Sequence, residues 1–176
     1  KLYRGGVEGS ADITANMTLQ TWTYFKGVSG EEKQDYSQNY RATATGVAVR
    51  NTTISWYKNS GSDILVRADS ADSDAALTQT KLYRNGTEGI DTIDPATMKL
   101  QTLSYFKGLS GEEKIDFAQN YRSNGLDVRN TTISYYRNLD GSVVRANLAH
   151  PDAALAETKL YRGGVEGSAD ITANMT

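Results

Sequence analysis

The chain repeats itself, and this repetition limits its possible folds more than any other feature of the sequence. Residues 1–18, KLYRGGVEGSADITANMT, return letter for letter as residues 159–176, and a diverged copy begins at Lys81. The match extends through the units, since LQTWTYFKGVSGEEKQDYSQNYR at 19–41 aligns with LQTLSYFKGLSGEEKIDFAQNYR at 100–122. A period of about 79 residues indicates an array whose units bury their apolar faces on one another.

The repeat divides the chain into unit A at residues 1–80, unit B at residues 81–158, and the start of a third unit at residues 159–176. The third copy matches the first better than the second does, which suggests an alternating A-B order. The chain begins with Lys and stops early in the third unit, so we expect a segment of a longer array.

Each unit contains three copies of a shorter motif, in which an aromatic residue follows a threonine by three places and a glycine comes about six places later. The aromatic residues are Tyr3, Tyr24, Trp56, Tyr83, Tyr105, Tyr135 and Tyr161, of which Tyr3 holds the same place at the start of the chain. The turn glycines are Gly30, Gly61, Gly89, Gly111, Gly141 and Gly167. Threonine and aromatic residues favour strands and glycine favours turns, so the motif predicts a β-hairpin.

We therefore predict an all-β fold, a tandem array of stacked β-hairpins forming a solenoid or a spiralling sheet, with about three hairpins in each unit. The repeated aromatic residues would form a ladder along the stack, or alternatively an exposed platform for sugar rings. A helix over residues 111–121 is the rival reading, but the Phe and Tyr content favours a strand. Asp74-Ala-Ala-Leu and Asp152-Ala-Ala-Leu each predict one short helical turn capped by the aspartate.

Composition argues against most other functions. The chain has no Cys, one His and a net charge of −2, which excludes thiol chemistry and thiolate zinc sites and offers no basic surface for nucleic acid. It also lacks the apolar run of about 20 residues needed to insert into a membrane. His150 reads as a solvated loop residue, and unit B loses two of the three carboxylates of Asp69, Asp72 and Asp74. We expect no enzyme activity, no cofactor and no metal.

The hairpins, such as SYYRNLDGSVVRANLAHPDAA at 134–154, resemble the YD-type repeats of RHS proteins and related bacterial surface and toxin proteins. The resemblance implies hairpins that begin with an aromatic residue and join into a long spiralling sheet. The sequence departs from that family because Phe or Arg replaces the defining Asp after Tyr24, Tyr83, Tyr105 and Tyr136. The hairpins are also similar to the aromatic-rich cell-wall-binding hairpins of secreted bacterial proteins.

These observations predict a non-enzymatic structural segment of a large extracellular or cell-surface protein, forming a stalk, fibre or sheath. Its partners would be the neighbouring repeats, and open strand edges would allow self-association into filaments. Two alternatives stay open. One is a curved RHS-like shell enclosing a toxin, and the other is a set of adhesin repeats that bind a glycan or cell-wall polysaccharide.

Overall fold

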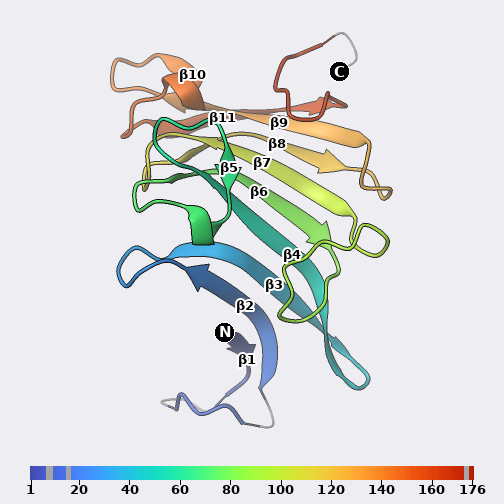
Figure 1. Ribbon diagram of the computed structural model, residues 1–176. Helices are drawn as coiled ribbons and strands as arrows, with labels where there is room; N and C mark the ends of the chain where they lie inside the picture. Colours follow the sequence, from blue (N-terminus) through green and yellow to red (C-terminus); the bar gives the residue numbers. More distant parts are fainter. Residues whose placement is uncertain (7–9, 15–16, 173–174) are drawn as a thin grey trace.

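The computed structural model describes residues 1–6, 10–14, 17–172 and 175–176, and these form one antiparallel sheet of eleven strands. The strands pair in the order β1-β2-β3-β4-β6-β7-β8-β9-β10, with β5 also paired to β4 and β11 also paired to β9. Figure 1 shows an open, twisted sheet with the two chain ends at opposite sides of it. The prediction of an all-β fold is confirmed.

The strands of unit A and its boundary are β1 (Leu2–Arg4), β2 (Thr18–Lys26), β3 (Lys33–Thr43), β4 (Gly46–Lys58), β5 (Leu65–Val66) and β6 (Ala76–Arg84). The remaining strands are β7 (Leu100–Lys107), β8 (Lys114–Tyr121), β9 (Val128–Arg137), β10 (Val143–Arg145) and β11 (Ala154–Arg162). Single 3-10 turns lie at η1 (Ala68–Ser70) and η2 (Ala146–Leu148). None of the described residues form a helix that could cross a membrane.

The strands follow the alternation of their side chains. In β8, Phe117, Gln119 and Tyr121 are buried while Ala118 and Asn120 between them are half-buried. A period of two suits a strand with one face packed and the other open, and it is incompatible with a helical stripe. The strand reading of this segment is therefore confirmed.

A short excursion leaves the sheet at the same place in each unit. After β4 the chain turns back as β5, which pairs with Tyr57 and Lys58 beyond the point where β3 stops pairing. It then passes through η1 to reach β6 on the other side of β4. The chain makes the same excursion from β9 through β10 and η2 to β11.

Small apolar clusters hold these excursions. Tyr57 packs with Ala68 and Ala75 in unit A, and Tyr136 packs with Ala146 and Ala153 in unit B. The helical turns predicted at Asp74 and Asp152 are wrong, because the residues that follow enter β6 and β11 and pair with β4 and β9. The single turns lie earlier, at η1 and η2.

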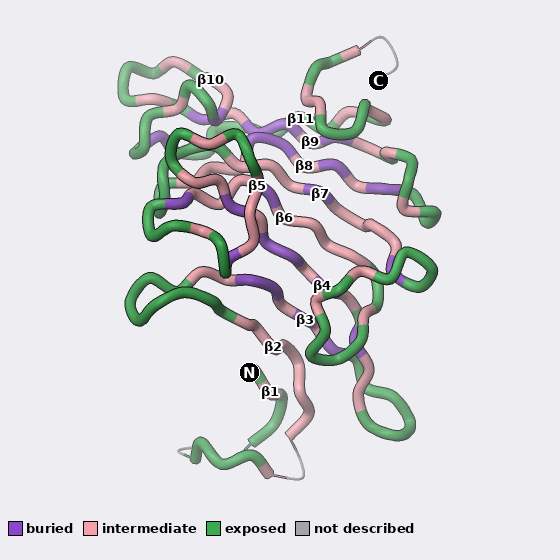
Figure 2. Tube along the Cα trace, in the orientation of Figure 1, coloured by how far each residue is buried: buried purple, intermediate pink, exposed green. Residues whose placement is uncertain are grey.

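Burial is concentrated on the middle strands. Figure 2 shows buried residues along β3, β4, β8 and β9, whereas the connecting loops are largely exposed. Several buried residues are polar, including Gln38, Thr52, Gln119 and Thr131, all at 0% exposure. Buried polar groups of this kind need hydrogen-bond partners, and these partners come from the neighbouring unit.

Candidate functional site: the contact between successive units

A long connection from each unit folds back over the unit before it. Residues 85–99 join β6 to β7, and their first part, residues 85–91, lies against β3 and β4. We call residues 85–91, and the equivalent residues 163–169, the docking loop. The surface that each loop contacts is called the receiving site, formed by Tyr24, Tyr36, Gln38 and Thr52 in unit A and by Tyr105, Phe117, Gln119 and Thr131 in unit B.

Gln38 is the centre of the first receiving site. Its Nε2 donates to the carbonyl oxygens of Thr87 at 2.8 Å and Ile90 at 3.1 Å. Its Oε1 accepts from the backbone N–H of Gly89 at 2.9 Å. One buried side-chain amide thus satisfies three backbone groups of the docking loop, each bond contributing about 1 kcal/mol net.

Thr52 sets how closely the loop approaches. It lies opposite Gln38 on the neighbouring strand, and its hydroxyl donates to the carbonyl oxygen of Asn85 at 3.1 Å. Gly86 follows with φ of +148°, and a Cβ there would collide with Thr52 Oγ1. Only glycine combines this backbone conformation with so close a contact.

Further contacts surround this centre. The Tyr36 hydroxyl donates to the carbonyl oxygen of Gly89 at 2.9 Å. Arg67 contacts Asp35 at 2.8 Å and Asp91 of the docking loop at 3.0 Å. Asp35 is only 4% exposed, so its ion pair with Arg67 is largely shielded from water. Through its contacts with both aspartates, Arg67 connects the η1 excursion and the docking loop to β3.

The second receiving site reproduces the bonds of the glutamine and the threonine, whereas Ala169 stands where the first docking loop has Asp91. Gln119 Nε2 donates to the carbonyl oxygens of Val165 at 2.7 Å and Ser168 at 3.0 Å, and Gly167 N–H donates to Gln119 Oε1 at 2.9 Å. The Thr131 hydroxyl donates to the carbonyl oxygen of Gly163 at 2.9 Å. Phe117 occupies the position that Tyr36 has in unit A. Because phenylalanine has no hydroxyl group, the described contacts of the second site include no equivalent of the bond from Tyr36 to Gly89.

Burial keeps the tyrosines in and beside these sites in their neutral form. Desolvation raises the pKa of Tyr40 to about 12, and it raises the pKa values of Tyr36 and Tyr121 further. Nearby carboxylates and tyrosines add to the rise. These hydroxyls therefore stay protonated through the neutral range.

All seven residues of the predicted ladder, namely Tyr3, Tyr24, Trp56, Tyr83, Tyr105, Tyr135 and Tyr161, are half-buried residues on strands. Tyr24 stacks on Trp22 and Tyr36, and Tyr105 stacks on Phe117. Stacking thus joins each of these two to its own hairpin. A ladder running along the whole array stays a prediction.

The six predicted turn glycines all have positive φ. Gly30 and Gly111 lie between β2 and β3 and between β7 and β8, and Gly61 and Gly141 lie between β4 and β5 and between β9 and β10. Gly89 and Gly167 have a different position, because they belong to the docking loops and donate to the receiving glutamines.

Sequence reasoning missed the residues that receive the loop. Gln38 and Gln119 occupy alternate positions between buried aromatic residues, where an apolar residue is the ordinary choice. A polar residue repeated in a buried strand position was the available signal. Sequence reasoning also missed the ion pair Asp35–Arg67 and its repeat Asp116–Arg145, although a buried aspartate recurs at the equivalent strand position in both units. The two charged groups are 2.8 Å apart in each pair.

Other candidate chemistry is sparse in the part of the chain that is described. No group of three or more metal-ligating side chains gathers there. His150 is exposed and lies 3.6 Å from Asp152. Comparison of the chain with family models, curated proteins and solved structures gives no match.

Proposed function

We propose that this chain is a non-enzymatic structural segment of a large extracellular or cell-surface protein. Successive units extend a single antiparallel sheet and together form a stalk, fibre or sheath. On this proposal the stacked hairpins of the sequence motif correspond to strands added edge to edge. The chain's work is to project or coat, and its principal partners are its own neighbouring repeats.

The observation that carries the proposal is the repeated contact between units. Both docking loops engage the preceding unit through a buried glutamine and a buried threonine. Strands also pair across the repeat boundary, since β6 contains the junction at residue 80 and pairs with both β4 and β7. Stability is then gained at each junction, as in other repeat arrays.

A closed shell is the second candidate, and the twist of the sheet favours it. Adjacent strands turn by about 20–25° in an ordinary sheet, and Figure 1 shows the strands of this chain changing direction along the sheet. If the curvature accumulates in one direction, a longer array closes on itself and encloses a space, as the RHS resemblance implies. A glycan-binding role is the third candidate.

Small-angle scattering separates the first two candidates. We would prepare chains with one, two and four tandem copies of residues 1–158 and measure the maximum dimension of each. A dimension that rises linearly with copy number supports the stalk. A dimension that levels off while the mass increases supports the shell and contradicts the stalk.

A matched pair of variants tests whether the docking loops set this geometry. Gly86→Ala places a methyl group against Thr52, while Gly46→Ala adds the same group at a similar φ of +141° into open space. We expect the first variant to loosen the junctions and change the scattering profile, and the second to leave it close to the original. Equal profiles for the two variants would argue against coupling through the loop.

A further inference from the structure

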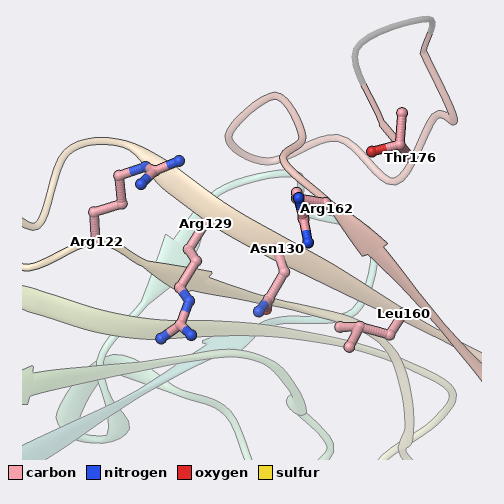
Figure 3. Close-up of a pocket in the computed structure, with 6 residues that line it drawn as sticks. All are labelled: Arg122, Arg129, Asn130, Leu160, Arg162 and Thr176. Atoms are coloured by element: carbon pink, nitrogen blue, oxygen red, sulfur yellow. The ribbon is translucent and has the colours of Figure 1, made fainter.

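Three arginine side chains lie close together on the sheet, those of Arg122 and Arg129 from unit B and that of Arg162 from the third unit. The carbonyl oxygen of Arg129 accepts from the N–H of Gly163 in the docking loop at 2.9 Å, but among the described residues the three side chains form no hydrogen bond with that loop. Arg122 follows β8, Arg129 lies on β9 and Arg162 ends β11, and all three are exposed. With Asn130, Leu160 and Thr176 they line an open cavity of about 550 Å³. Figure 3 shows Arg129 and Asn130 extending to the same side of β9, with Arg162 of the neighbouring β11 beside them.

Strand register brings these residues together. Asn130 lies opposite Asn120 on one side and opposite Arg162 on the other. The pairing of β8 and β9 shifts between Asn120 and Tyr121, which leaves Arg129 as the extra residue of a bulge. Because bulges redirect side chains, Arg129 can lie beside Asn130 instead of alternating with it.

Among the described residues, none of Arg122, Arg129 and Arg162 forms an ion pair, whereas Arg145 is paired with Asp116 at 2.8 Å. The nearby Asp127 carboxylate accepts a hydrogen bond from Asn124 at 2.7 Å. Three guanidinium groups without a carboxylate partner repel one another and favour a bound anion.

Equivalent residues occur where unit A meets unit B, namely Arg41, Arg50 and Asn51 of unit A and Leu82 and Arg84 of unit B. Asn51 lies opposite Asn39 and Arg84, and a shift in register at Asn39 leaves Arg50 as the extra residue. We call each group an arginine triad. Equivalent strands of the two triads are four strands apart, or about 19 Å at ordinary strand spacing.

Periodic sites of this kind fit a polymer with regularly spaced negative charges. We propose that the arginine triads bind an acidic polysaccharide through its carboxylate or sulfate groups. The guanidinium groups supply paired N–H donors for these oxyanions, and Leu82 and Leu160 supply apolar surface beside them for the sugar rings. Binding at one triad does not rest on the proposed stalk.

The surface suits a polysaccharide better than a nucleic acid. Single-stranded nucleic acids use stacking aromatic side chains in a continuous basic groove. Here Tyr24 and Tyr36 stack on the face of the sheet that receives the docking loop, since Tyr36 is two residues from Gln38 along β3. Asn39, which pairs with Asn51 of the triad, is next to Gln38 and therefore points to the other face. The chain as a whole also has a net charge of −2.

The test uses the full chain of residues 1–176 and four immobilised polymers. Heparin supplies sulfate groups, polygalacturonate supplies carboxylates, dextran is neutral, and duplex DNA supplies phosphates. We expect retention on heparin or polygalacturonate that falls steeply with added salt, and no retention on dextran. The acidic polymer that binds more tightly identifies the preferred oxyanion.

Matched variants locate the site. The variant R41Q/R50Q/R84Q/R122Q/R129Q/R162Q removes both triads, and the variant K26Q/R137Q/K107Q removes other exposed cations. We also include the single-triad variant R122Q/R129Q/R162Q, which removes as many charges as the control. We expect it to weaken binding by about tenfold and the control to change binding by less than about threefold.

Several results would overturn the proposal. These are no retention on either acidic polysaccharide, equal losses in the single-triad and control variants, or triad-dependent binding to DNA that is as tight as binding to the polysaccharides. Because all six arginines are exposed, the variants should unfold at the same temperature as the parent chain. Circular dichroism checks this, and the single-triad variant is replaced by R129K if its folding is impaired.

Discussion

Replacing Gln38 by Glu tests the docking contact with almost no change in shape. The amide Nε2 of Gln38 donates to the carbonyl oxygens of Thr87 and Ile90. In Gln38→Glu an oxygen takes the place of that nitrogen. When ionised, it loses both bonds and places a negative charge at a fully buried position facing two carbonyl oxygens.

The sign of the pH dependence follows from this environment. Burial and facing carbonyls disfavour the charged carboxylate, so its folded-state pKa is raised above the unfolded value of about 4.3. The protonated form still donates one hydrogen bond, so we expect a loss of about 1–3 kcal/mol at pH 4. Stability then falls as the pH rises from about 4.3 to the raised pKa, and a rise of about two units costs about 3 kcal/mol more.

Urea unfolding between pH 4 and pH 8 measures the effect, followed by the fluorescence of Trp22 and Trp56, both in unit A. Gln20→Glu, at a half-buried position on β2, is the control for added negative charge. Gln119→Glu should behave like Gln38→Glu in unit B. If the difference from the parent chain is the same at pH 4 and pH 8, the docking contact assigned to Gln38 is incorrect.

Three further perturbations test other parts of the contact. Gly86→Ala should lower the free energy of unfolding by about 1–3 kcal/mol more than Gly46→Ala. The reason is that a Cβ collides with Thr52 at the first site and meets open space at the second. Equal losses of unfolding free energy in urea would refute this. Arg67→Met should lower the free energy of unfolding by about 2–3 kcal/mol, which is less than for a fully buried ion pair because the Arg67 side chain is 22% exposed. In a double-mutant cycle, adding Asp35→Asn should recover part of this loss. Because the pKa of Tyr40 is raised to about 12, the folded state should lose stability as the pH rises from about 10 to about 12. The absorbance lost on replacing Tyr40 by Phe should show this tyrosine ionising at about pH 12, and ionisation at about pH 10 in the folded chain would contradict the assignment.

Much of the local structure could be read from the sequence. The Phe and Tyr content predicted the strand at residues 114–121 against a rival helix, because the preference of these side chains for strands acts within a short segment. Glycines placed after each aromatic motif have positive φ. These properties are local, so a single chain segment is enough to specify them.

The short helical turns at Asp74 and Asp152 show where local reasoning failed. An aspartate before two alanines is an ordinary helix start, but β4 and β9 offer strand pairing to the residues that follow. The segment after each aspartate therefore becomes β6 or β11. Pairing with a distant strand outweighed a weak local preference.

The sequence by itself determined the repeat, the strands and most of the turns, because each depends on the order of residues within a short segment. Only the tertiary structure decided that Gln38 receives Gly89 and that Arg41, Arg50 and Arg84 lie together. Residues as many as 53 positions apart meet at the docking contact, and their approach depends on strand register and on a loop that folds back. No periodicity encodes such an approach, since it arises only when the whole sheet is assembled.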